Sequence, residues 1–176
     1  MASDELDKVE LPALEQLQSL GWSYVEGAKL SPSDPPKASD ERSSLKDVVL
    51  EKRLVQGLKR INPWINDENL RKVIRELTKT LYPNLIEANQ GIWTQINQCI
   101  SVMQDLGKGN KGQTVHIIDF ENPENNEFLC TNQFKVSGVN QNIIPDILCF
   151  VNGLPLAVIE CKSPYITNPM EAGIDQ

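Results

Sequence analysis

Two apolar runs joined by Asn152-Gly153 constrain the fold of this chain more than any other feature. The runs cover residues 143–151 and 155–162, and both are rich in branched apolar side chains. Asn-Gly between two such runs is a strong signal for a tight β-hairpin, because both residues tolerate the positive φ that the turn requires. We therefore expect two neighbouring antiparallel strands here.

The rest of the chain divides into a helical part and a part with strand character. Before Lys108 apolar residues recur at helical spacing, and after it the pattern is typical of strands. Four helices are expected, over residues 10–20, 44–61, 67–81 and 84–103. Ser44 and Asp47 would form a capping box at the start of the second helix, and Asp67 would cap the third. Residues 107–113 are expected to form a turn, and strands are expected at 22–25, 114–120 and 127–136. The predicted fold class is α/β, a mixed and largely antiparallel sheet flanked by helices, with an additional helical segment at about 45–104.

Composition excludes several classes of protein. With 176 residues, 40% hydrophobic and 23% charged, the chain is long enough to bury a core and too apolar for a disordered tail. No apolar run approaches the ~18 residues of a membrane span, and the acidic start is no secretory signal. The missing apolar run predicts that the chain has no membrane partner. Four irregularly spaced cysteines without a C-x-x-C pair predict reduced thiols and a cytoplasmic location. A single histidine, His116, argues against histidine-based catalysis and leaves carboxylates as the chemistry to look for.

The net charge of −7 is unevenly distributed. Residues 45–112 carry eleven bases against seven acids, whereas residues 1–44 and 113–176 are acidic. A basic segment between acidic ends suits a protein that contacts phosphate in one region and holds metal in another. Arg71, Lys72 and Arg75 are the candidate DNA-binding residues of this segment; the alternative is a helix face that displays its bases to solvent.

Charged residues at the ends of the two apolar runs form the candidate catalytic set. Asp146 interrupts the first run, and Glu160 and Lys162 end the second. Glu160 and Lys162 are two residues apart and share a face of an extended strand, while the hairpin brings Asp146 back beside them. Charges on otherwise buried strands are costly unless metal or partner groups compensate.

Two carboxylates and an ammonium at one end of a sheet suit metal-dependent phosphodiester hydrolysis. Mg²⁺ is usually held by one or two carboxylates together with waters and substrate phosphates. It polarises the phosphoryl group, and a lysine beside it can stabilise the developing charge. The alternative is a cross-strand salt bridge at a sheet edge.

Parity along the hairpin turns this assignment into a structural prediction. A regular two-residue turn would place Asp146 and Glu160 on opposite faces of the sheet, where they could not share a metal ion. We therefore expect an odd-length connection or a β-bulge between Asp146 and Glu160.

The pattern Pro-Asp…Glu-x-Lys resembles the PD-(D/E)xK nuclease superfamily. The longer stretches HIIDFENPENNEFLCTNQF and IIPDILCFVNGLPLAVIECKSP resemble the N-terminal nuclease region of the motor (R) subunit of type I restriction endonucleases. This resemblance implies a restriction-endonuclease-like sheet and a nuclease domain over residues 1–176, as a fragment of a longer motor subunit. It implies that Asp146 and Glu160 are metal ligands and that Lys162 is the catalytic lysine.

Two further residues are carried over by the same resemblance. Glu10 matches the acidic residue that such nucleases often add to the metal shell; the alternative is a solvated glutamate that the helix dipole favours. Gln176 matches the first position of a downstream Gln-x-x-x-Tyr element and would contact DNA.

The function implied is a Mg²⁺-dependent endonuclease domain that cuts double-stranded DNA, that is, a type I site-specific deoxyribonuclease. In the family cutting is coupled to ATP-driven translocation, and modification and specificity subunits are the partners. ATP is expected only in the motor region, because residues 107–114 lack the lysine of a phosphate-binding loop and precede a strand. The alternative is a non-catalytic docking domain that anchors the motor to its partner subunits.

Overall fold

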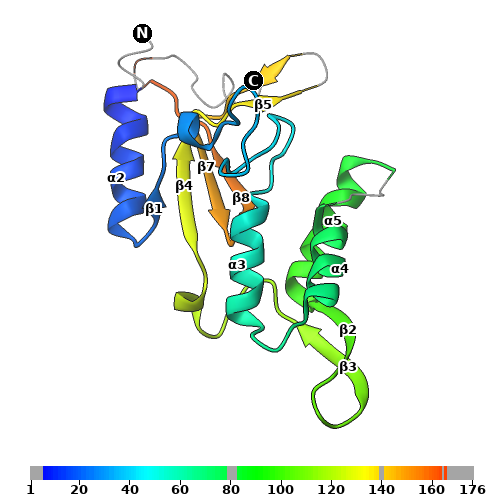
Figure 1. The fold of residues 1–176 in the computed structure, drawn as a ribbon. Coiled ribbons are helices and arrows are strands. Elements are labelled where there is room, and N and C mark those ends of the chain that lie inside the picture. Colours follow the sequence, from blue (N-terminus) through cyan, green and yellow to red (C-terminus); the bar gives the residue numbers. More distant parts are fainter. Residues whose placement is uncertain (1–5, 79–82, 139–140, 164, 166–176) are drawn as a thin grey trace. The chain divides into compact units, whose positions relative to one another are not determined.

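The computed structural model describes residues 6–78, 83–138, 141–163 and 165. The chain divides into two compact units, one of residues 1–48 with 128–176 and the other of residues 49–127. Figure 1 shows the elements of both. Each unit is described by itself.

The first unit contains a four-stranded sheet with the order β1-β4-β7-β8. Its strands are β1 (Ser23–Tyr24), β4 (Phe128–Asn132), β7 (Ile147–Val151) and β8 (Leu154–Ile159). β1 runs parallel to β4, whereas the pairs β4–β7 and β7–β8 are antiparallel. The mixed, largely antiparallel sheet and the hairpin at Asn152-Gly153 are therefore confirmed, and with the helices they make the fold α/β.

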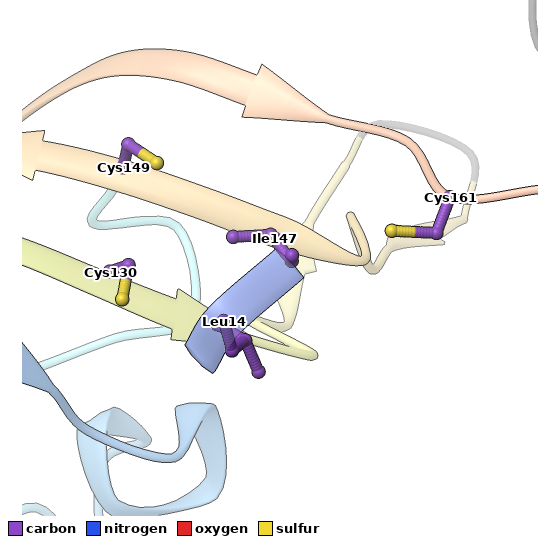
Figure 2. Packing of buried hydrophobic residues seen from close by; sticks show 5 residues of the cluster. All are labelled: Leu14, Cys130, Ile147, Cys149 and Cys161. Carbon is purple, nitrogen blue, oxygen red and sulfur yellow. The ribbon is translucent and has the colours of Figure 1, made fainter. Parts of the chain in front are cut away.

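Helix α2 (Leu11–Ser19) packs on this sheet and follows a π-helical turn, η1 (Leu6–Glu10). Leu14 of α2 shares a buried cluster with residues of β4, of β7 and of the segment after β8. Figure 2 shows this packing, with Leu14 beside Ile147 and the thiols of Cys130, Cys149 and Cys161 around them. The apolar spacing of residues 10–20 predicts a helix with one buried face, and α2 buries that face against the sheet.

The segment between β1 and the second unit is mostly irregular, as its prolines and serines indicate, with a single 3-10 turn, η2 (Gly27–Leu30). The expectation that Ser44 and Asp47 open a helix is wrong. The Asp47 carboxylate instead accepts hydrogen bonds from the backbone N–H groups of Ser43 and Ser44 and closes a local turn. Two short strands, β5 (Val136–Ser137) and β6 (Asn142–Ile143), form a separate antiparallel pair.

The described residues of the second unit form three α-helices and a β-hairpin. Its elements are α3 (Glu51–Ile61), α4 (Asp67–Thr78), α5 (Leu85–Gln98), β2 (Ile100–Asp105), β3 (Asn110–Val115) and η3 (Pro123–Asn125). α3 packs on α4, and α4 packs on β2. The predicted helices are confirmed in their middle parts.

Several boundaries in this unit differ from expectation. The strand predicted over 114–120 ends at Val115, so that prediction is wrong beyond this residue. The helix predicted over 84–103 ends at Gln98, because the residues after Cys99 pair with β3 along their whole length. β3 begins at Asn110, inside the predicted turn. Asn66 rather than Asp67 caps α4, since its Oδ1 accepts the N–H of Asn69 at 2.8 Å.

All four cysteines are free thiols. Burial raises the pKa of the Cys130 and Cys149 thiols. Among the described residues, no helix combines the length and the apolar character needed to cross a bilayer.

Candidate active site

A two-residue turn followed by a β-bulge sets the geometry of the hairpin. Asn152 and Gly153 have φ values of 49° and 80°, as a type I′ turn requires. A regular ladder from this turn would pair Ile147 with Val158. Ile147 instead pairs with Ile159, because the register shifts by one residue within the hairpin. The predicted bulge between Asp146 and Glu160 is therefore confirmed.

Asp146 and Glu160 lie directly beyond this last pair of residues. Ile147 and Ile159 are the last paired residues, and a ladder continued by one more residue would set Asp146 opposite Glu160, on the same face of the sheet. Asp146 Oδ2 accepts a hydrogen bond of 2.7 Å from the backbone N–H of Cys161, which ties the two strand ends together. Asp146 and Lys162 are half-buried and Glu160 is exposed, so these groups lie where a substrate can reach them.

Glu10 is buried at the end of η1, with only 3% of its surface exposed. Its carboxylate accepts hydrogen bonds from Asn132 Nδ2 at 2.7 Å and Gln133 Nε2 at 3.2 Å. A buried carboxylate needs such donors to offset its lost hydration. The alternative of a solvated glutamate at a helix start is therefore wrong, and Glu10 belongs to a polar network beside the sheet.

The carboxylates of this region offer the hard oxygen donors that Mg²⁺ prefers. Within the described part of the chain, no group of three or more acidic, histidine or cysteine side chains is close enough to hold a metal ion by itself. Two carboxylates with waters and phosphate oxygens remain a sufficient Mg²⁺ shell, and Asp146 and Glu160 fit that requirement by their register.

The sequence profile described as type I restriction enzyme R protein N terminus matches residues 3–176, nearly the whole chain. The chain belongs to this family. A relative from Methanocaldococcus jannaschii, provisionally named as the type I restriction enzyme MjaIXP endonuclease subunit, is 34% identical over 159 residues. The type I restriction enzyme HindI endonuclease subunit of Haemophilus influenzae is 33% identical over 157 residues. Both alignments cover 89% of this chain, and the resemblance to the N-terminal region of the type I R subunit is confirmed.

The chain spans about 15% of the length of these two relatives. The family model that it matches describes the N terminus of R proteins.

The candidate DNA-binding bases of this R-protein domain lie on α4. Arg71, Lys72 and Arg75 are all exposed, while the apolar residues of the helix are buried. This arrangement is compatible with phosphate contact and equally with a solvated face, so the assignment stays a prediction. Gln176 lies outside the described residues.

His116 and the glycine-rich segment at residues 107–114 both lie in structural contexts. The backbone N–H and C=O of His116 both bond to the side-chain amide of Asn62, which makes this residue part of the scaffold. Residues 107–114 form a hairpin tip and most of β3, a context unlike the strand-to-helix turn of a phosphate-binding loop.

Sequence reasoning assigned no role to three polar residues of the R-protein domain that surround Glu10. These are Tyr24, Asn132 and Gln133. The Tyr24 hydroxyl donates to Asn132 Oδ1 at 2.7 Å, and burial, followed by the nearby Glu26 and Glu10 carboxylates, raises the pKa of Tyr24. The available signal was the polar pair Asn-Gln at the end of an otherwise apolar strand.

Proposed function

We propose that this domain is the endonuclease module of a type I restriction enzyme and hydrolyses phosphodiester bonds of double-stranded DNA with Mg²⁺. The observation that carries the proposal is the register of β7 and β8, in which the bulge pairs Ile147 with Ile159, so that Asp146 and Glu160 are the next residues beyond this pair. Without that shift the two carboxylates would lie on opposite faces and could not share one ion. The names of the relatives, both endonuclease subunits, support the same assignment.

Each of the three residues has a distinct role in this proposal. Asp146 and Glu160 would hold Mg²⁺, and the Cys161 N–H fixes the orientation of the Asp146 carboxylate through its Oδ2. Bound Mg²⁺ supplies Lewis acidity toward the phosphate and lowers the pKa of its water. Lys162 follows Glu160 by two residues, and its ammonium stabilises negative charge that develops on the phosphate.

We assign the remaining functions of such an enzyme to regions outside this chain. Because this chain spans about 15% of its relatives, we place ATP-driven translocation outside it. Modification and specificity subunits, which would select the DNA, are the proposed partners, together with the DNA itself.

A supercoiled-plasmid cleavage assay of the full-length assembled enzyme tests the proposal. Asp146→Asn and Lys162→Ala should each abolish detectable cleavage while DNA-stimulated ATP hydrolysis continues, because neither residue is assigned to the motor. Lys111→Ala, which removes an exposed lysine on β3, is the matched control and should cut at the wild-type rate.

The same assay separates the nuclease from a docking domain. If Asp146→Asn and Lys162→Ala both support normal cleavage, the carboxylates are structural and the nuclease assignment fails. Loss of ATP hydrolysis together with cleavage in both variants would point instead to a domain that holds the assembly together.

A further inference from the structure

Lys8 and Tyr165 form a contact between η1 and the segment after β8. The Lys8 ammonium lies 4.8 Å from the centre of the Tyr165 ring and donates a hydrogen bond of 3.4 Å to its hydroxyl oxygen. Both residues are exposed, Tyr165 with 74% of its surface. An ammonium over an aromatic ring keeps a preferred position while its outer side still faces solvent.

The Tyr165 end of this contact lies beside the candidate active site. Tyr165 follows Lys162 by three residues, so their Cα atoms are at most about 11 Å apart. Successive phosphates of one DNA strand rise by about 3.4 Å along the helix axis, so this distance spans about three nucleotides. A base held at Tyr165 is therefore close to the part of the DNA that would lie in the site.

The Lys8 end is tied to the same region by a second route. Lys8 precedes Glu10 by two residues in η1. The Glu10 carboxylate accepts a hydrogen bond of 3.2 Å from Gln133 Nε2, and the backbone N–H of Gln133 donates to the Asp146 carbonyl at 3.1 Å. These bonds connect η1 to the strand end that carries Asp146.

The unit that contains the site has few bases with which to meet DNA. Residues 1–48 and 128–176 hold seven lysines and arginines against fourteen aspartates and glutamates. Such an excess of negative charge repels phosphate, so attraction has to come from cations at the site itself. Lys8 supplies an exposed cation there, beyond the one that Lys162 supplies.

We propose that Lys8 binds a backbone phosphate that flanks the cleaved phosphodiester, and that Tyr165 is the positioning residue that holds the Lys8 ammonium beside the site. This inference rests on the proposed nuclease function. A contact to phosphate sets where the strand lies and reads no base, so the ligand is the nucleic-acid backbone of any sequence.

Binding of a fluorescein-labelled DNA duplex to the chain, followed by anisotropy with Ca²⁺ in place of Mg²⁺, tests this contact apart from cleavage. Lys8→Gln should reduce the magnitude of the slope of log K against log salt concentration by about 0.9. It should therefore weaken binding about 8-fold at about 0.1 M salt, and the difference should vanish toward about 1 M. Lys8→Arg keeps the charge and should retain the wild-type slope. Lys29→Gln, at an exposed lysine of the same unit, is the matched control and should bind as the wild type does.

A double-mutant cycle tests the positioning role of Tyr165. Tyr165→Ala should weaken binding at about 0.1 M salt in the wild-type background and have no effect in the Lys8→Gln background, because its role runs through Lys8. Tyr165→Phe keeps the ring under the ammonium and should bind more tightly than Tyr165→Ala. An equal loss from Tyr165→Ala in both backgrounds would reject the positioning role.

Two results for Lys8→Gln would overturn the phosphate contact. One is a wild-type slope, and the other is a loss of affinity that is equal at every salt concentration, as a structural role would cause. A wild-type chain that does not bind the duplex would overturn it as well. The plasmid assay separates this inference from the proposed function: normal cleavage by Asp146→Asn and Lys162→Ala rejects the nuclease, whereas lost cleavage in both, with a wild-type slope for Lys8→Gln, rejects only the contact.

Discussion

Replacing Arg42 by methionine should strongly lower the free energy of unfolding of the unit that contains the four-stranded sheet. Arg42 is 98% buried, with 2% of its surface exposed. Its guanidinium donates hydrogen bonds of 2.9–3.2 Å to the carbonyls of Leu30, Asp47 and Lys135. It also lies 3.9 Å from the centre of the Phe134 ring. Arg42 thereby ties the irregular segment after β1 to the residues that follow Gln133.

The magnitude follows from what methionine leaves behind. Three carbonyls lose their donor, and a buried polar group without a partner costs about 1–3 kcal/mol. The cation–π contact with Phe134 contributes up to about 2 kcal/mol more in a desolvated setting. Against this, the variant no longer has to bury a charge, a cost that is visible in the way burial lowers the pKa of Arg42. We expect a net loss of about 3 kcal/mol, a large share of the 5–15 kcal/mol typical of a domain.

Urea unfolding followed by Trp22 fluorescence measures this loss. Trp22 packs edge-on against Phe128 in the same unit, and a background in which Trp64 and Trp93 are replaced by phenylalanine makes the signal specific. Lys29→Met is the control, because the Lys29 side chain is 74% exposed and a surface ion pair contributes at most about 1 kcal/mol. A change below about 1 kcal/mol for Arg42→Met would refute the reasoning that the three carbonyls depend on this guanidinium.

Three other outcomes are expected. Gly27→Ala should destabilise the fold by about 1–3 kcal/mol, because the added Cβ would overlap backbone oxygens. Gly112→Ala is the control and should be tolerated, because its Cβ would meet only a side-chain oxygen at 3.4 Å. Equal melting temperatures for the two variants would contradict this expectation. A hydrogen bond from the Asn125 side chain, and next to it one from a backbone N–H, lowers the pKa of Asp119. The ionised Asp119 therefore contributes fully to the free energy of unfolding above the ordinary aspartate pKa of about 3.9. This contribution is lost as the pH falls through the lowered pKa. Asp119→Asn should therefore differ most from the wild type in urea unfolding above about pH 5, and a difference that is the same at every pH would disprove the linkage. Arg71, Lys72 and Arg75 are the exposed bases of α4. If they contact phosphate, replacing all three by alanine should reduce the slope of log K for DNA binding against log salt concentration by about 0.9 per contact. An unchanged slope would indicate a solvated face.

Local sequence signals determined much of this domain. Asn152-Gly153 predicts its hairpin because a type I′ turn needs two residues that accept positive φ, a requirement met within the turn itself. The apolar stripes of α2, α3 and α4 also predict helices locally. Residues three and four positions apart lie on one face of a helix, whatever the helix packs against. Parity along the hairpin even required an irregularity between Asp146 and Glu160 before its form was known.

Boundaries set by competing partners needed the tertiary structure. The residues after Cys99 form a strand although their spacing also suits a helix, because β3 supplies backbone partners along their full length. The same holds for the hairpin: sequence allowed either a longer loop or a bulge, and pairing on both sides of β7 selected the bulge.

Glu10 shows most clearly where sequence reasoning ends. Its type and its place before a helix suit a solvated side chain as well as a ligand. Asn132 and Gln133, more than 120 positions later, bury it and supply its hydrogen bonds. A carboxylate is stable away from water only where donors converge on it, and no local pattern records which distant strand will bring those donors.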